Sequence, residues 1–330
     1  MKLLVLCPGK IATAPDKIKC FTDVLNYYLP KALLEVVDTT VISIPDSDND
    51  QLKNVFSTLN VDGYDAILTL GLRFYSKISP ETTTLLRDRF VGLFCQVHDG
   101  SRLNHDPVDI TFTFKNDDER LKGNTGWYAR HKQYNEYMGW ASDPEINRPQ
   151  QDPRNLRILV DHTNYGDNDV DMTVEVLEQI RRFVDSELWR RDFDSVSVRR
   201  FDSGQVVDVD FNDMSIQRYD RTAIPFTEIT QEHCAAHIFC VTHPESVGLV
   251  VLETAMAGAL PVIPKGFIPK DRLKTIRYAE WEHRINWNYV MSKLDIERSR
   301  QMALENTWPA MANRIVQALE RRLQAGDQHD

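Results

Sequence analysis

The sequence has little of several features that mark other classes of protein. Its five cysteines are odd in number and scattered, which fits reduced thiols better than a disulfide framework. No run approaches 18 apolar residues, so no transmembrane helix is predicted, and the apolar start before Pro8 is too short for a signal peptide. The net charge of -10 argues against nucleic acid or anionic lipid as a partner. We therefore expect a cytoplasmic protein.

The length and composition favour two globular domains. A chain of 330 residues exceeds the usual size of one hydrophobic core, and 42% hydrophobic with 27% charged residues is an ordinary globular balance. A polar stretch rich in Trp and Tyr, residues 115–153, reads as loops and a domain junction. We expect domains at 1–150 and 151–330, with a ligand cleft between them and a terminal helix that crosses back to the first domain.

Both halves alternate short apolar runs with amphipathic stretches, the pattern of parallel strands connected by helices. In the second half, Met172, Val176, Ile180 and Phe183 recur at helical spacing, and Gly258 ends a helix predicted over 247–257. The fold class expected is therefore α/β with two Rossmann-like domains. Strands are predicted at 2–7, 36–43, 65–70, 90–96 and 109–114, then at 157–161, 195–201, 205–209, 237–242 and 260–264; helices are predicted at 16–36, 50–59 and 295–325.

Residues 243–262 carry the most chemical information. They read as a strand end, an acidic loop, an apolar helix, a glycine stop and a strand. A helix starting near Ser246 directs backbone N–H groups around Val247 and the positive end of its dipole toward a cleft, which suits a diphosphate, and Gly248 permits close approach. Glu245 and Glu253 are eight residues apart, about 12 Å along a helix, a span comparable to that from sugar to ribose in a nucleotide-sugar.

A structural interpretation of the same glutamates stands beside the functional one. Glu253 could be a solvated helix residue, and Glu245 an acid favoured by the helix dipole. Against this, residues 249–259 are apolar on nearly every face. Glu253 is therefore expected to be partly buried and to need a partner.

The stretch resembles the retaining glycosyltransferases of the GT-B fold, whose signature places two glutamates with seven residues between them. By that resemblance Glu245 contacts the donor sugar and Glu253 the ribose, and turnover needs neither a metal nor a cofactor. Trp308 is similar to the start of the family's terminal helix. The residues kept from the signature are Glu245, Gly248, Leu249, Glu253, Ala255, Ala257, Gly258, Pro261 and Val262.

The first half matches this family more loosely. His98 ends a likely strand in the same way as the family's histidine near the transferred sugar, although a histidine in that place is often structural. Gly9 and Lys10 follow the first strand, where the family has a turn facing the diphosphate. The family's Arg and Lys after the first strand of the second domain are missing from 161–169. Lys10, Arg73 and Lys265 each follow a predicted strand and are candidates to replace that charge.

Other patterns in the sequence are weaker. His233, Cys234, His237 and Cys240 have ligand types that zinc accepts, but they run from a helix into a strand, where alternate side chains point apart. Three short Asp-x-Asp turns at 167–171 and 208–210 resemble a metal site of another glycosyltransferase fold. Because there are three candidates, none of them is specific. The aromatic residues of 127–140 could stack on an acceptor sugar or pin a loop to its domain.

The function expected is transfer of a sugar from a nucleotide-sugar donor to a glycan or other small acceptor. The same fold hosts other chemistry, so fold alone does not license the activity. Two alternatives stay open: a nucleotide-sugar epimerase or hydrolase, and a degenerate homologue that binds sugar without catalysis. The missing basic pair favours the second alternative.

Overall fold

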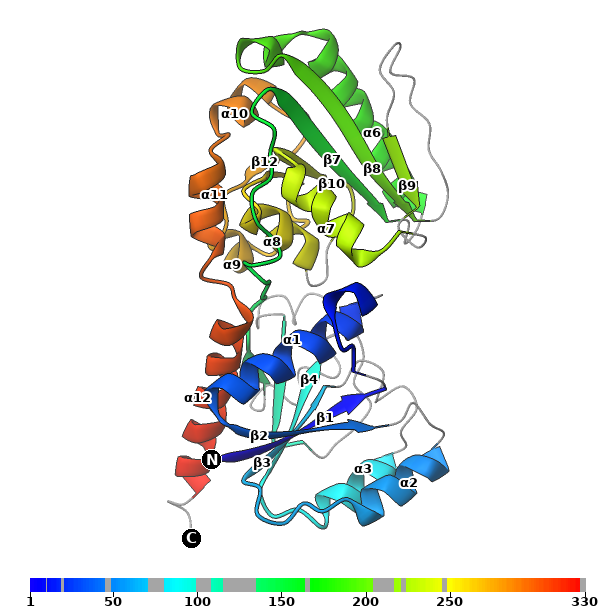
Figure 1. Cartoon of the computed structure of the whole chain (residues 1–330), viewed down its shortest axis with the longest axis vertical. Coiled ribbons are helices and arrows are strands. Elements are labelled where there is room, and N and C mark those ends of the chain that lie inside the picture. Colours follow the sequence, from blue (N-terminus) through cyan, green and yellow to red (C-terminus); the bar gives the residue numbers. More distant parts are fainter. Residues whose placement is uncertain are drawn as a thin grey trace. The chain divides into compact units, whose positions relative to one another are not determined.

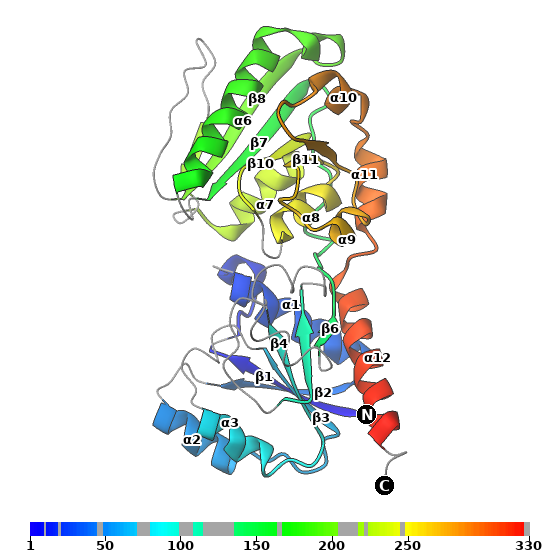
Figure 2. The same ribbon diagram turned by 180° about the vertical axis from the view of Figure 1, so that it is seen from behind.

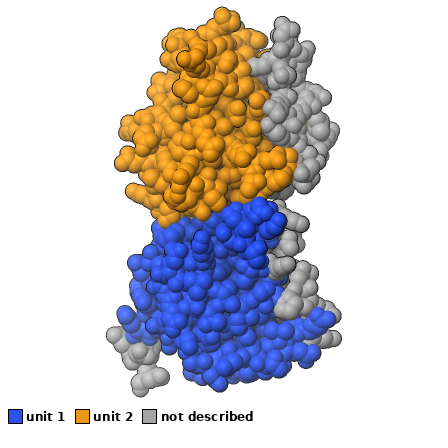
Figure 3. Space-filling view, viewed as in Figure 1, with its two compact units in different colours: residues 1–139, 308–330 blue, residues 140–307 orange. Residues whose placement is uncertain are grey.

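The computed structural model divides into two compact units, 1–139 with 308–330 and 140–307, each built on a parallel sheet (Figures 1 and 3). The domain boundary thus lies at 139/140, whereas 150/151 was expected. Residues 140–150 belong to the second unit because their backbone is bonded there, as in Gln150 N–H donating to Cys234 O at 2.9 Å. The structure describes residues 1–9, 11–18, 21–44, 49–70, 80–98, 108–114, 135–163, 167–203, 217–220, 224–244 and 248–326.

The sheet of the first unit has the order β2-β1-β3-β4-β5-β6, and every neighbouring pair is parallel. Side chains of α2 and α3 pack on one face, in a cluster with Leu4 and Ile67. Helices α1 and α12 lie side by side (Figures 1 and 2), and the rings of Tyr28 and Trp308 stack at 5.6 Å. The elements are β1 (Lys2–Pro8), a 3-10 turn (Pro15–Lys17), α1 (Phe21–Val36), β2 (Asp38–Ile44), α2 (Asn49–Thr58), β3 (Ala66–Leu70), α3 (Pro80–Arg87), β4 (Leu93–His98), β5 (Ile110–Thr113), β6 (Asn135–Tyr137) and α12 (Trp308–Gly326).

The sheet of the second unit has the order β12-β11-β10-β7-β8-β9, again parallel throughout. Val176 and Ile180 of α6 pack on one face with Ile158 and Ile238, while α7 and α8 contribute to the other. The elements are β7 (Asn155–Thr163), α6 (Asp167–Asp185), a 3-10 turn (Leu188–Arg191), β8 (Ser195–Ser203), β9 (Gln217–Asp220), α7 (Phe226–Ala235), β10 (Ile238–Val241), α8 (Leu249–Met256), β11 (Leu260–Pro264), α9 (Lys270–Leu273), β12 (Ala279–Trp281), α10 (Trp287–Ser292) and α11 (Ile296–Ala303).

Most predicted elements are present within two or three residues of their expected bounds. The helix predicted over 16–36 is divided, with a 3-10 turn before α1, and Pro30 lies inside α1. The helix predicted over 295–325 is also divided, into α11 of the second unit and α12 of the first. The strand predicted at 205–209 falls outside the described residues, and β6, β9, β12, α3, α9 and α10 were not predicted. Among the described residues, no helix is long and apolar enough to span a bilayer.

Candidate functional site

The strand order of the second unit has a point where it reverses, between β7 and β10. From β7 the chain moves outward through β8 and β9, then returns to β10 on the other side and continues through β11 and β12. Ligands of open parallel sheets bind outside the carboxyl ends of the strands at such a point. Val241 ends β10 there, and the loop that follows leads directly into α8. The described residues on either side of the motif's loop, at the end of β10 and the start of α8, therefore lie at the place that the topology favours.

Gly248 forms the turn into α8. Its φ of +73° lies in the left-handed region, where a side chain would be strained, and it is the N-terminal cap residue of the helix. Leu252 N–H donates to Gly248 O at 3.2 Å, which closes the first helical turn. Because α8 starts here, its positive end faces the loop after β10. Glu245, Ser246 and Val247 lie outside the described residues, and their predicted roles stay predictions.

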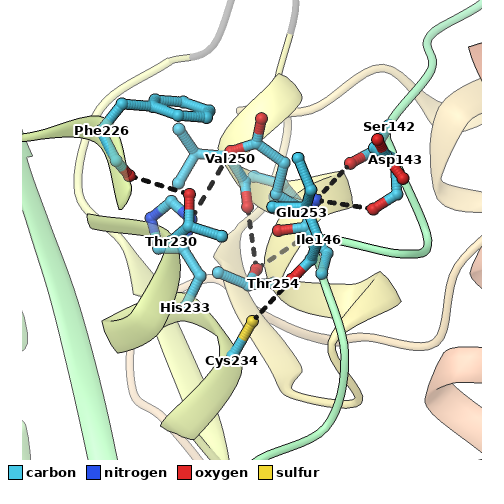
Figure 4. A network of polar contacts seen from close by, with 12 residues as sticks. Ser142, Asp143, Ile146, Phe226, Thr230, His233, Cys234, Val250, Glu253 and Thr254 are labelled. Atoms are coloured by element: carbon cyan, nitrogen blue, oxygen red, sulfur yellow. Dashed lines mark hydrogen bonds and ion pairs between the residues drawn. The ribbon is translucent and has the colours of Figure 1, made fainter. Parts of the chain in front are cut away.

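Glu253 is buried, as its apolar surroundings predicted, with 8% of its surface exposed. One carboxylate oxygen, Oε2, lies 3.5 Å from Nδ1 of His233, in the last turn of α7, and the two side chains point toward one another (Figure 4). The His233 ring meets Phe201 edge-on, with centroids 5.9 Å apart. Sequence reasoning weighed His233 as a zinc ligand only. The signal that could have found this pair is the requirement that a buried acid have a polar partner.

The carboxyl ends of α7 and α8 are held by side chains from elsewhere in the unit. The Gln151 amide donates to Ala236 O and Ala257 O, each at 2.8 Å. Arg300 of α11 donates to Met256 O at 2.8 Å and to two carbonyls of residues 140–150. Cys234 Sγ donates to Ile146 O at 3.3 Å (Figure 4). The bonds to Ala236, Ala257 and Met256 satisfy carbonyls that helix ends leave without an internal partner, and the others tie these ends to the 140–150 segment, so Glu253 projects from a helix fixed at its far end.

The first unit has its own reversal point, between β1 and β3. Gly9 follows β1 with a φ of +73°, and its N–H donates to Ile44 O at 2.7 Å. His98 is the last residue of β4. Lys10, Arg73 and the His98 side chain lie outside the description, so the roles predicted for these residues and for Gly9 stay predictions.

Lys265 directly follows β11 and is exposed. Its ammonium nitrogen lies 3.0 Å from Oε2 of Glu282, which is equally exposed, and this contact lowers the pKa of the Glu282 carboxyl. A pair in this setting is screened by water. Lys265 therefore lies at the carboxyl edge of the sheet, where its partner is an exposed acid, and the role predicted for it stays a prediction.

The weaker metal patterns find no support in the described residues, where no group of three or more His, Cys, Asp or Glu side chains could hold a metal ion. His237 Nδ1 instead accepts from the Arg157 backbone N–H at 3.2 Å. Burial lowers the pKa of His237 to about 4, Arg157 acts in the same direction, and Asp152 opposes them. Residues 167–171 lie in α6, and residues 208–210 fall outside the description.

Solved structures share this fold over nearly the whole chain. An α,α-trehalose-phosphate synthase (UDP-forming) from Burkholderia vietnamiensis has a TM-score of 0.59 at 9% identity, covering 98% of both chains. The Anabaena protein HepE, in complex with UDP and glucose, has a TM-score of 0.55 at 11% identity over 97% of this chain and 99% of its own. A putative UDP-N-acetylglucosamine 2-epimerase from Listeria monocytogenes has a TM-score of 0.54 at 15% identity, covering 98% of both.

No protein-family model matches the sequence, and no curated protein matches it. The likeness to solved structures, at these identities, shows the fold. The α/β architecture with two Rossmann-like units, expected from the resemblance to GT-B enzymes, is confirmed, and the chain has the GT-B fold.

Proposed function

We propose that this chain transfers a sugar from a UDP-sugar donor to a glycan or another small acceptor. The observation that carries the proposal is a coincidence of two independent features. The two-glutamate motif was identified by residue type, spacing and resemblance, and in the strand order β10 and α8, which flank its loop, meet the reversal point between β7 and β10. We choose UDP as the nucleotide of the donor because structures of the same fold are named as UDP-forming or as UDP complexes.

In this proposal the two glutamates divide the donor between them. Glu253 accepts hydrogen bonds from the ribose hydroxyls, and its contact with His233 fixes the carboxylate before the donor arrives. Glu245 contacts the donor sugar, and the N–H groups at the start of α8 meet the diphosphate. His98, at the end of β4, lies by the transferred sugar. Retention of the anomeric configuration follows from the resemblance alone.

The leaving diphosphate develops negative charge, which preorganised donors must meet. The sequence lacks the family's basic pair, so the proposal assigns this work to the start of α8 and to Lys265, with Lys10 and Arg73 as further candidates. Lys265 is the best placed of the three, because β11 directly follows the helix that carries Glu253.

An epimerase that acts on the same donor is the second candidate. The observation that favours it is the fold shared with the Listeria protein named as a putative UDP-N-acetylglucosamine 2-epimerase. The two activities differ in their need for an acceptor. An epimerase changes the sugar of the donor without one, whereas a transferase releases UDP and forms a new glycoside only when an acceptor is present.

The test begins with binding and ends with product analysis. A thermal-shift screen with UDP, GDP, ADP and their sugars identifies the nucleotide, because a ligand that binds the native state raises its melting temperature. The donor selected is then followed by proton NMR with and without a panel of sugar acceptors. Acceptor-dependent release of UDP supports transfer, and conversion of the sugar without acceptor supports epimerisation. If the donor binds and neither reaction occurs, the result supports a sugar-binding protein without catalysis.

Glu253→Gln tests the ribose contact. The change keeps the shape of the side chain and removes its charge, so the free energy of UDP binding should weaken by about 1.5 to 3 kcal/mol, the scale of a hydrogen bond to a charged group. Glu232→Gln is the matched control, because Glu232 is a half-buried acid in the same helix as His233 and pairs with Arg157 at 3.1 Å. Titration calorimetry with UDP measures both variants. Equal affinity for UDP in the two variants would show that Glu253 does not contact the nucleotide.

A further inference from the structure

Trp140 is the first residue of the second unit and is almost fully buried, at 1% exposure. Its indole Nε1–H donates to Oγ1 of Thr275 at 3.1 Å. The polar edge of the ring is thereby satisfied inside the unit, and the rest of the ring is free to pack as an apolar surface.

The six-membered part of the Trp140 ring lies beneath the turn at Gly248. A Cβ placed on residue 248 would be 3.4 Å from Cζ3 and 3.7 Å from Cε3 of Trp140, and 3.5 Å from Cδ1 of Ile268. The ring and the isoleucine thus line the space into which a side chain at position 248 would point. Gly248 is also where the chain enters α8, so this apolar surface lies at the start of the helix.

The anchor of Trp140 is itself tied to the place where the chain leaves the unit. Thr275 Oγ1 donates to Arg272 O at 2.9 Å, and its carbonyl accepts from the Asn306 amide at 3.4 Å. Ser142 N–H donates to Asn306 O at 3.0 Å, and Ser142 forms a parallel bridge with Thr307. Both segments that connect the units, before Trp140 and after Thr307, therefore meet at one hydrogen-bonded cluster that also holds the indole.

We propose that Trp140 is a positioning residue for the nucleotide: its ring supports the Gly248 turn and, through that turn, the N–H groups at the start of α8 that meet the diphosphate. The inference rests on the proposed function for the identity of the ligand. It goes beyond the two-glutamate motif, because Trp140 is more than 100 residues upstream of Gly248 in sequence and lies near it only through the fold.

The experiment compares two tryptophans of the same unit. Trp287 is also buried, donates its indole N–H to Gln179 O at 3.1 Å and stacks on Phe183 at 4.4 Å. Trp140→Phe and Trp287→Phe each remove a buried indole hydrogen bond, so a loss of general stability affects both. UDP is titrated into each variant by calorimetry at a temperature where circular dichroism shows both folded, and amide exchange is followed in peptides covering 248–256.

We expect Trp140→Phe to raise the dissociation constant for UDP roughly tenfold. This is the lower end of the loss of affinity seen when a residue that supports a binding site is removed. Amide exchange at the start of α8 should accelerate in this variant, and Trp287→Phe should match the wild type in both measurements. Equal effects in the two variants, or wild-type behaviour of Trp140→Phe, would overturn the inference.

Two further arms keep the test decisive. If Trp140→Phe does not fold, Thr275→Val replaces it, since this change removes the acceptor of the indole N–H and leaves the ring. It should weaken UDP binding in the same direction, and unchanged binding would count against the role. If the wild type binds no UDP, the proposed function fails; the exchange data then decide separately whether Trp140 holds the Gly248 turn.

Discussion

Gly258→Ala should destabilise the second unit far more than a glycine substitution ordinarily does. Gly258 ends α8 with a φ of +97°, where its N–H donates to Ala255 O and the next N–H, of Ala259, donates to Thr254 O. This pair of bonds is the Schellman arrangement, which needs a left-handed residue at this position. A Cβ would also lie 2.5 Å from Cγ2 and 3.1 Å from the carbonyl oxygen of Ile296.

The magnitude has two parts that the structure separates. Left-handed backbone costs a residue with a side chain about 1 to 2 kcal/mol. Forcing an extra methyl into an occupied space adds about 1 to 3 kcal/mol. Gly266 has a φ of +84° with no atom within 4 Å of a Cβ, so Gly266→Ala carries only the first part. Gly258→Ala should therefore lower the free energy of unfolding by about 2 kcal/mol more than Gly266→Ala.

Urea unfolding followed by tryptophan fluorescence measures the difference between these two variants. A third protein, carrying Gly258→Ala with Ile296→Ala, tests the origin of the crowding, because Ile296→Ala removes the Cγ2 atom that the new methyl meets. The double variant should be more stable than the sum of its two single changes predicts. Equal loss in Gly258→Ala and Gly266→Ala, or strict additivity with Ile296→Ala, would refute the reasoning.

Two more predictions concern charge. Lys265→Ala should raise the Michaelis constant for the donor and weaken UDP binding by roughly 1.5 to 3 kcal/mol. Glu282→Gln removes the charge that pairs with Lys265 at 3.0 Å, so it should leave UDP binding intact or strengthen it. Unchanged UDP affinity in Lys265→Ala would show that this residue does not contact the nucleotide. The pKa of His237 falls from 6.5 to about 4 on folding, so the unfolded chain binds the additional proton and stability is lost as the pH falls from 6.5 toward 4. His237→Asn keeps an acceptor for Arg157 N–H. When the pH is lowered from 7.5 to 5.0, its free energy of unfolding in urea should fall by about 2 kcal/mol less than that of the wild type. An equal fall in both proteins would mean that His237 does not titrate in this way.

The strands and helices that the sequence predicted are those with a clear apolar period. β3, β10 and β11 are buried along their length, β1 is buried after Lys2, and α6 repeats its apolar residues at helical spacing. The missed strands β6 and β12 have three residues each, too few to show alternation. Their strand geometry comes from a neighbour already in the sheet, which no local pattern reports.

The domain boundary and the Glu253 partner were beyond prediction for a related reason. Trp140 belongs to the second unit because of a hydrogen bond to Thr275, 135 residues away. His233 lies beside Glu253 because α7 and α8 pack together, although 20 residues separate them. The sequence indicated that Glu253 needed a polar partner, and pinning a loop to its domain was one of two roles open for the aromatic residues of 127–140. It held no information on which residues would meet them, because that depends on the strand order.

Strand order is also what makes the sequence motif informative about a site. A glycine after a strand and an acid on a helix are common, and alone they do not indicate a ligand. In this chain the loop between β10 and α8 opens at the reversal point of its sheet, and the turn after β1, with Gly9, opens at the reversal point of the other. Parallel sheets leave room for a ligand at such points because the connections on either side diverge. The residues proposed for the donor were chosen by type, spacing, position after a predicted strand and resemblance to a family, without knowledge of the strand order in this chain. That the described parts of both loops lie where the two topologies leave space is therefore an independent argument for a ligand there, and it is the argument that mutation of Glu253 and Trp140 tests most directly.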